Sequence, residues 1–300
     1  MRILAAYALL LVVVAPQAPL PSRDRAEWLA LAKGGFVVPD GTRAVDLLVE
    51  MNALLGSPDP VLRDEVAYSA AEKWILRDKR LSPADLRQVL RLWSSNLDDG
   101  VGEVGGDRIF KRSFSALCLS LVAAADLQTA FLEPLEAQAF FNRMVDYFRR
   151  ERDLRGFDAQ RGWLHSVAHT SDALKFLLRD ARLAAGSDAR LLDAVKAKLE
   201  AHDAVFVWGD NDRIALALHA AVRRADADPD ALKAWAEHWV AAHAALWANG
   251  PHVEPRRFAV VENAKQVMRA LHTALSMDVT LTPTSDVARV TLLAALAKMR

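Results

Sequence analysis

The 300-residue chain has one cysteine, no excess charge of either sign and no stretch of alternating polar and apolar residues. The single cysteine, Cys118, excludes an intrachain disulfide and any zinc site built from cysteines. Its neighbours in FSALCLSLVAAA are almost all apolar, so we expect a buried thiol rather than a nucleophile. Thirty-eight basic residues balance thirty-eight acidic ones, and no lysine- or arginine-rich tract is present. We therefore expect no nucleic-acid partner.

The N-terminal segment MRILAAYALLLVVVAPQAPLPSRDR has one basic residue followed by an apolar run from Ile3 to Ala15. This run is too short to span about 30 Å of hydrocarbon comfortably, but its length suits the core of a signal peptide. We expect residues 1–21 to be a signal peptide that directs export, in a bacterium to the periplasm. An uncleaved N-terminal membrane anchor is the alternative. Residues 22–300 are expected to form a single helical-repeat domain, and the mature chain is expected to have no membrane span.

Helix starts recur in one chemical form, a capping residue followed by proline. The capping side chain accepts a hydrogen bond from a free amide, and proline at the next position has no amide to lose. The examples are DPVLRDE at 59, SPADLRQ at 82, DPDALKAW at 228, TPTSDVARV at 282 and the weaker LEPLEAQ at 132. With the nearly continuous helical spacing of apolar residues, these signals predict eleven or twelve helices. Their expected spans are 24–33, 42–55, 60–78, 83–98, 108–125, 134–151, 161–183, 188–206, 210–225, 229–247, 256–276 and 284–299.

Five of the helical segments share a pattern in which a polar residue precedes a run of small residues. The polar residues follow one another at intervals of 47, 53, 48 and 52 residues, and they are Glu65, Arg112, His165, Arg213 and Lys265. A period near fifty with two helices per unit is typical of an α-solenoid. We therefore predict an all-α fold, an irregular HEAT-like α-solenoid of stacked antiparallel helix pairs. A closed α/α toroid is the alternative.

Four segments together are typical of one bacterial family. They are VLRDEVAYSAAEKWI, SNLDDGVGEVGGDRIFKRSFSALCLSL, YFRRERDLRGFDAQRGWLHSVAHTSDAL and DNDRIALAL. In this order they resemble the domain-of-unknown-function family number 2785, from about residue 60 to 275. The block from Gly162 to His169 is the most specific part of the resemblance. The family has no established reaction, so the resemblance implies an all-helical, HEAT-like fold and no activity.

The stretch RGWLHSVAHTSDAL contains His165, His169 and Asp172. On an ideal helix His169 lies about 40° from His165, and Asp172 lies about 20° to its other side. Two histidines one turn apart can present two imidazole nitrogens to one metal ion, and an aspartate can join or orient them. Against a zinc-protease site, the residue directly after the first histidine is Ser166 and not glutamate. The other interpretation is that each imidazole bonds a group on the adjoining helix. We predict no cofactor and no metal, with His165 and His169 as weak metal candidates.

If equivalent positions stack, the five polar residues form a ridge along the inner helices. The residues expected to flank this ridge are Asp64, Asp107, Asp212, Asn263 and His169. Buried charges need partners, so one interpretation is a ladder of ion pairs such as Glu65 with Arg112. The other is a polar groove for an extended peptide or a small anionic ligand, because an arginine fork binds carboxylate or phosphate well. The candidate groove residues are Glu65, Arg112, His165, His169, Asp172 and Arg213.

Two functions stay open at this point, and the sequence does not decide whether the chain is an enzyme. The first is an exported binding or scaffolding protein whose partner is a protein, a peptide or a small anion. The second is a hydrolase-like enzyme centred on His165, His169 and Asp172, with or without a metal ion. In that enzyme Arg112 or Arg213 binds the charge of the substrate, and Glu65 is the acid or base.

Overall fold

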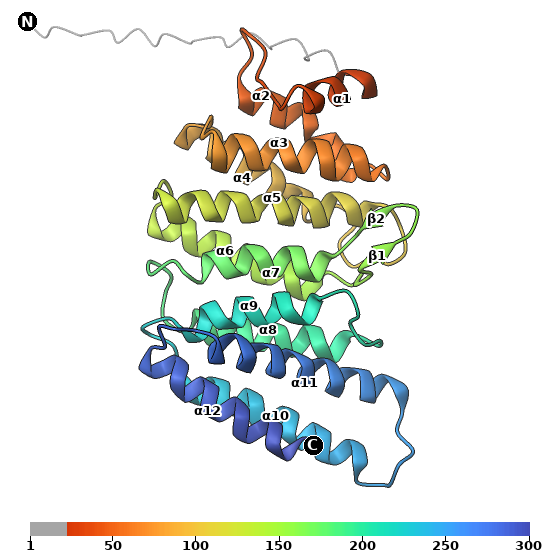
Figure 1. Cartoon of the computed structure of the whole chain (residues 1–300), viewed down its shortest axis with the longest axis vertical. Coiled ribbons are helices and arrows are strands. Elements are labelled where there is room, and N and C mark those ends of the chain that lie inside the picture. Colours follow the sequence, from red (N-terminus) through yellow and green to blue (C-terminus); the bar gives the residue numbers. More distant parts are fainter. Residues whose placement is uncertain (1–22) are drawn as a thin grey trace, which may run out of the picture.

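The helices form an elongated stack in which the chain progresses from one end of the long axis to the other (Figure 1). The computed structural model describes residues 23–300, so the predicted signal peptide at 1–21 lies outside the described residues. Helices α1 (Arg25–Lys33) and α2 (Ala44–Glu50) begin the stack, and α12 (Pro283–Lys298) lies at its opposite end. The all-α fold of stacked helix pairs is confirmed, and the stack is open rather than closed into a toroid.

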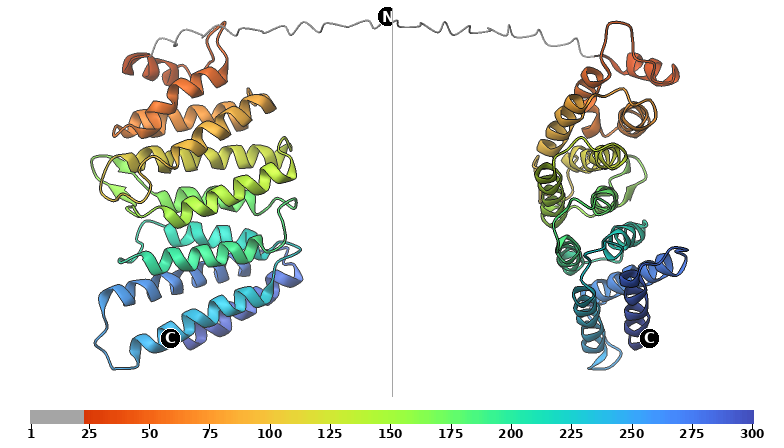
Figure 2. Two further views of the ribbon diagram at one scale, coloured as in Figure 1. Left: turned by 180° about the vertical axis from the view of Figure 1, so that it is seen from behind. Right: turned by 90° about the vertical axis from the view of Figure 1, so that its left-hand side faces the viewer.

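Most of the stack consists of two layers, which the side view in Figure 2 shows next to each other. The layer that we call the inner layer contains four helices, each packed against the next: α5 (Arg108–Gln128), α7 (Ser166–Leu177), α9 (Asp210–Val222) and α11 (Pro255–Ser276). The outer layer contains α4 (Pro83–Asn96), α6 (Pro134–Arg150), α8 (Ser187–Ala201) and α10 (Pro229–Trp247). The inner helices start along one edge of the stack and end along the other (Figure 1). We call these the N-terminal edge and the C-terminal edge.

The capping signals explain where most helices begin. Ser82 and Thr282 form capping boxes with Asp85 and Ser285, and proline occupies the first turn of α4, α6, α10, α11 and α12. One connected cluster of buried apolar side chains extends from Trp28 to Met299 and lies between the layers. Cys118 is part of this cluster, as expected for an inert thiol, and burial raises the pKa of its thiol.

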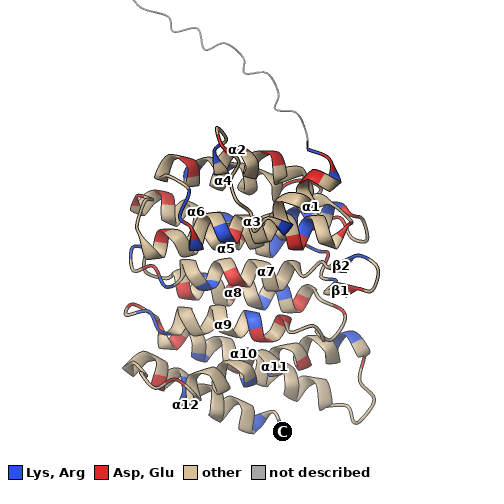
Figure 3. Ribbon diagram, turned by 45° about the horizontal axis from the view of Figure 1, so that its top comes forward, with Lys and Arg blue, Asp and Glu red and all other residues tan. Residues whose placement is uncertain are grey.

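The segment predicted as one helix over 60–78 is continuous but irregular. It follows the 3-10 helix η1 (Met51–Gly56) and consists of η2 (Val61–Tyr68), α3 (Ser69–Glu72) and η3 (Lys73–Arg77). The parts η2 and η3 have π-helical hydrogen bonding, which widens the turns. Figure 3 shows basic and acidic residues interspersed over the helices rather than gathered by sign. Within residues 23–300, the search for a helix with the length and hydropathy of a membrane span finds none.

The largest departure from the predicted helices lies between α6 and α7. Strand β1 (Phe157–Asp158) pairs with β2 (Gly162–Trp163) in an antiparallel hairpin. The Asp158 carboxylate stabilises the turn by accepting hydrogen bonds from the backbone amides of residues 160 and 161. Gly162 follows with a φ of 75°, a left-handed conformation that favours glycine. As a result α7 begins at Ser166 and not at 161. The prediction that His165 shares a helical face with His169 and Asp172 is wrong, because His165 is the N-cap residue and has a φ of 50°.

Candidate functional site

A buried arginine from another repeat fixes the hairpin to the inner layer. Arg63 Nη1 donates to the Ser57 carbonyl oxygen at 2.6 Å, and its Nη2 donates to the Arg161 and Trp163 carbonyl oxygens at 2.6 and 3.2 Å. The guanidinium carbon lies 4.1 Å from the ring centroid of Phe110. Burial lowers the pKa of Arg63 to about 10, so the group is still charged at neutral pH. The backbone at Trp163 is therefore held rigidly.

Three aromatic side chains meet on the surface of the N-terminal edge. Phe157, Trp163 and Trp208 are 39, 38 and 45% exposed, and we call them the aromatic cluster. The ring centroid of Phe157 lies 4.9 Å from that of Trp163 and 5.5 Å from that of Trp208, and the two indoles are 6.1 Å apart and nearly perpendicular. The two pairs that Trp163 forms are edge-to-face, which is one of the favoured arrangements of aromatic rings. The cluster joins the hairpin to the loop that precedes α9.

The close packing of Trp208 depends on one glycine and one buried asparagine. A Cβ atom added to Gly156 would overlap the indole ring of Trp208. Asn263, predicted as a flank of the ridge, is buried in α11. Its side-chain oxygen accepts the Phe206 amide at 2.8 Å, and its nitrogen donates to the Ala204 carbonyl at 2.9 Å. These bonds tie the loop carrying Trp208 to the inner layer, and α8 ends at Ala201 rather than at 206.

His165 links the aromatic cluster to the inner helices. Its ring stacks on Trp163 with the centroids 4.7 Å apart and an angle of 18° between the planes. Its Nε2 lies 2.9 Å from the Trp208 carbonyl oxygen and 3.7 Å from Asp210 Oδ1. Because a carbonyl only accepts, we assign the proton to Nε2 and a lone pair to Nδ1. Burial lowers the pKa of His165, against the effect of the Trp208 carbonyl, and Arg213 lowers it further.

His169 lies deeper and is paired with a serine of α5. Its Nδ1 is 2.8 Å from Ser113 Oγ, and the Ser113 hydroxyl donates to the Leu164 carbonyl. The serine oxygen therefore accepts from Nδ1–H, which is the reverse of a histidine base activating a serine nucleophile. Burial and the neighbouring His165 hold the pKa of His169 well below its ordinary value. Ser113 is fully buried, so the Ser113–His169 pair is closed to substrates.

Asp172 bonds two cations rather than a histidine. Its Oδ2 pairs with Arg213, and its Oδ1 accepts from Lys175 Nζ at 3.1 Å. The side chain of Arg213 is 46% exposed, whereas Asp172 is buried. The rings of His165 and His169 are 5.6 Å apart. In the described part of the chain, no three histidine, cysteine, aspartate or glutamate side chains are grouped so that they could hold a metal ion.

The other predicted groove residues do not join this site. Arg112 is buried and binds Glu151 through two bonds, Nε to Oε2 at 2.6 Å and Nη2 to Oε1 at 3.1 Å. Glu65 is exposed on η2, so the pairing of Glu65 with Arg112, one of the two interpretations of the ridge, does not occur. Lys265 is half-buried on α11. The ridge is therefore not a continuous surface, and only His165, His169, Asp172 and Arg213 lie together.

A cavity of about 370 Å³ opens beside Trp208. Its lining includes Arg152, Arg155, His202, Asp203 and Asp210. Burial raises the pKa of Asp210 to about 6, although its own amide, the Ala168 amide and Arg213 lower it. Arg152, Phe157 and Trp208 were not predicted as site residues, because they lie between the helices, where no helical period aligns them. The one sequence signal for Phe157 and Trp208 is that aromatic residues flank the glycine-containing breaks before α7 and α9.

The comparisons with known proteins give one match. A family model described as "Protein of unknown function (DUF2785)" matches residues 97–273. This range covers more than half of the chain and contains the aromatic cluster, the two histidines and the cavity. Neither the curated proteins nor the solved structures contain a match.

Proposed function

The chain belongs to the family of proteins of unknown function DUF2785, which carries no stated reaction, and we propose that it is an exported, HEAT-like binding module for an extended polypeptide. The observation that carries this proposal is the aromatic cluster, three exposed rings in mutual contact beside an open cavity. The polypeptide places an apolar side chain on the cluster and an acidic side chain near Arg152. The apolar run from Ile3 to Ala15 supports export to the periplasm.

The aromatic cluster has the properties of a protein-binding anchor. Large aromatic side chains dominate binding energies at interfaces, and truncation of such an anchor costs about 2 kcal/mol or more. The rings of this cluster are also held in place before any partner arrives, by Arg63 under the hairpin and by Asn263 under the loop. Because little side-chain order has to be gained on binding, more of the contact energy contributes to affinity.

The charges around the cavity favour a polypeptide over a free anion. Arg152 is exposed, and within residues 23–300 its side chain forms no ion pair, whereas Arg155 is neutralised by Asp153. Asp203 is exposed on the same cavity. A cavity with both a positive group, Arg152, and a negative group, Asp203, suits a bound polypeptide, whose backbone amides and carbonyls and acidic side chain can pair with both. Arg152 then provides a planar fork for a carboxylate.

The hydrolase-like function has weaker support from the geometry. That function needs His165, His169 and Asp172 in one open pocket, with Glu65 or Arg112 close enough to contact the same substrate. Here Asp172 is bound by Arg213 and Lys175, and the hydroxyl of Ser113 is directed to a carbonyl. His165 is less buried than His169, and its contacts are with Trp163 and the Trp208 carbonyl.

An array of defined peptides, probed with the purified full chain, tests the proposal. The array varies two adjacent central positions over all residue pairs. We expect binding to peptides that contain an aromatic residue or leucine next to aspartate or glutamate. Trp208→Ala should weaken binding at least about tenfold, and Arg152→Ala should weaken it most at low salt.

Matched controls exist for both variants. Trp247 on α10 is 42% exposed, so Trp247→Ala removes a comparable indole far from the hairpin. Arg149→Ala removes an exposed arginine from the same segment as Arg152. Binding that is equally weakened by Trp208→Ala and Trp247→Ala would contradict the proposal, and so would an array without any bound peptide.

A further inference from the structure

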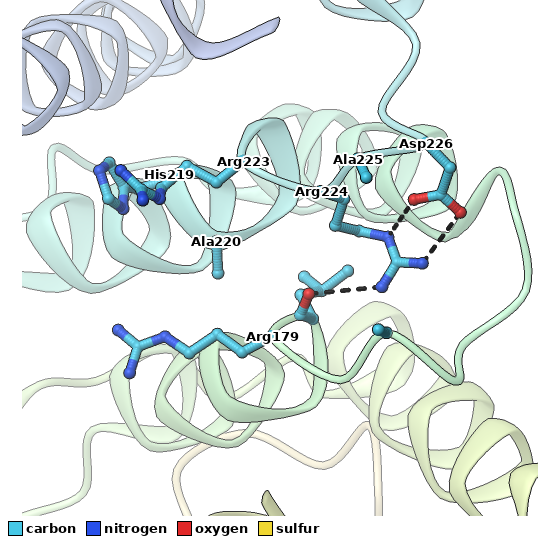
Figure 4. Close-up of a pocket in the computed structure, with 9 residues that line it drawn as sticks. Arg179, His219, Ala220, Arg223, Arg224, Ala225 and Asp226 are labelled. Carbon is cyan, nitrogen blue, oxygen red and sulfur yellow. Dashed lines mark hydrogen bonds and ion pairs between the residues drawn. The ribbon is translucent and has the colours of Figure 1, made fainter. Parts of the chain in front are cut away.

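A second cavity, of about 710 Å³, opens at the C-terminal edge between the ends of α7 and α9 (Figure 4). Helix α7 has 12 residues, which separate this cavity from the hairpin by about 18 Å at 1.5 Å per residue. The cavity wall contains three arginines and one histidine, which are Arg179, Arg223, Arg224 and His219. Leu178, three alanines and Asp226 form the rest of its lining.

Arg179 supplies charge that no protein group neutralises. Its side chain is exposed, and it forms no ion pair within the described residues, while its guanidinium lies 5.5 Å from the ring centroid of Phe176. In Figure 4 the guanidinium groups of Arg179 and Arg223 extend to the same side of the cavity, with Ala220 between them. Both arginines act on His219, whose pKa is lowered first by burial and then by these two charges. Positive charge is therefore concentrated at this side.

The carboxylates of the region are already engaged. Asp278 binds Arg223 and lies 3.2 Å from His219 Nε2, and Asp226 binds Arg224 with an Nε–Oδ1 distance of 2.9 Å. Among the side chains that line the cavity together with Asp278, three guanidinium groups and two carboxylates leave an excess of one positive charge, which lies at Arg179; the neighbouring Asp180 is paired with Arg182.

The end of α7 does not cancel this excess charge. The C-terminus of a helix carries partial negative charge on its free carbonyl groups. Arg224 donates to three of the carbonyls that follow α7, those of Leu178, Asp180 and Leu183. These loop carbonyls are thus satisfied by Arg224, and the last-turn carbonyls of Leu174, Phe176 and Leu177 accept the amides of Leu178, Arg179 and Asp180.

We propose that this cavity binds a small organic anion, a carboxylate or a phosphate monoester attached to an apolar body. The oxyanion pairs with Arg179 and the remaining N–H groups of Arg223. The apolar body contacts Leu178, Ala181 and Ala220. The volume lies within the range of about 300–1,000 Å³ that is usual for small-molecule sites, and it exceeds the need of a bare phosphate ion. This site is independent of the polypeptide site at the N-terminal edge.

Calorimetric titration of the full chain with phenyl phosphate and with benzoate at low salt tests the proposal, with benzyl alcohol as the neutral probe. We expect saturable binding of at least one anion and none of the alcohol. Arg179→Gln should weaken this binding at least about tenfold, since it removes a charge-assisted pair. Ala181→Trp should block the cavity from its exposed rim, without disturbing the core. Arg91→Gln, which changes an exposed arginine on α4, is the control and should have no effect.

The two anions separate the chemical sources of the ligand. Binding of benzoate alone assigns a carboxylate, and binding of phenyl phosphate alone assigns a phosphate monoester. The proposal fails if neither anion binds up to about 10 mM, or if binding survives both Arg179→Gln and Ala181→Trp.

Discussion

The buried ion pair between Arg112 and Glu151 connects α5 to the segment after α6, and its removal has a large expected cost. Besides the two bonds from Arg112, the Glu151 carboxylate accepts the Tyr147 hydroxyl at 3.1 Å and the Arg152 and Asp153 amides at 2.9 Å each. Arg112 Nη1 also donates to the Asp99 carbonyl at 2.8 Å. The variant Arg112→Met removes the guanidinium donors and leaves the buried Glu151 carboxylate without its ion-pair partner; Lys198 Nζ, a buried cation nearby, donates to the Glu151 carbonyl.

The size of the effect follows from the burial of both partners. Removing one member of a buried ion pair costs about 3–5 kcal/mol of unfolding free energy. For a chain of this size each kcal/mol lowers the melting temperature by about 2–4 °C, so we expect a decrease of about 6–20 °C. The double variant Arg112→Met, Glu151→Gln should recover part of this loss, since it removes the unpaired carboxylate and keeps an amide oxygen as acceptor for Tyr147 and the two backbone amides. Thermal unfolding followed by circular dichroism measures both effects.

A control and a binding measurement separate the structural role of Arg112 from a ligand-binding role. Arg87 forms a half-exposed pair with Glu136, and Arg87→Met should change the melting temperature less than Arg112→Met does. The folded Arg112→Met protein should bind peptides with unchanged affinity. The reasoning is refuted if Arg112→Met melts within about 2 °C of the wild type, or if it folds normally and loses peptide binding.

Two further predictions concern the N-terminal edge. Gly156→Ala should weaken peptide binding on the array as much as Trp208→Ala does, because the added Cβ displaces the Trp208 indole. The control is Gly106→Ala, which should leave binding intact because an added Cβ has open space there. His169→Gln should change the pH dependence of stability. The folded protein holds the pKa of His169 well below its ordinary value of 6.5. Below about pH 6.5 this histidine is therefore protonated in the unfolded chain but still neutral in the folded chain, so the free energy of unfolding falls as the pH falls. The contribution of His169 to the slope of unfolding free energy against pH approaches about 1.4 kcal/mol per pH unit. Urea titrations between about pH 5 and 7 should therefore show a shallower slope for His169→Gln than for the wild type. Equal slopes in the two proteins would contradict this assignment.

The helices could be predicted from the sequence because their signals are local. A capping side chain and a proline act within one turn, as at Ser82 and Thr282, and an apolar stripe repeats every three or four residues along one helix. The burial of Cys118 follows from the same local pattern. The helical period also placed α5, α7, α9 and α11 in successive repeats, which is the arrangement in the structure.

The positions of the site residues depend on contacts across repeats, and these leave no local signal. Arg112 was paired with Glu65 by its repeat position, whereas its partner Glu151 lies directly after α6. The hairpin exists because Arg63, about a hundred residues earlier, satisfies the carbonyls of Arg161 and Trp163. A helical wheel assumes a helical backbone at His165, and the left-handed conformation of this residue invalidates that assumption.

The parallel direction of the inner helices gives the two edges of the stack different chemistry. At the C-terminal edge, carbonyl groups attract arginines, as the bonds from Arg224 to three carbonyls of the segment after α7 show. An anion can bind at this edge only where an arginine is left over after the others have paired with carbonyl groups and carboxylates. Arg179 is such an arginine. At the N-terminal edge the helix amides themselves carry partial positive charge. Asp210 already accepts the Ala168 amide of α7 and its own amide in α9, so this carboxylate compensates both helix starts. An acidic side chain next to Trp208 would therefore be favoured by Arg152, and a basic side chain there would be opposed by Arg152.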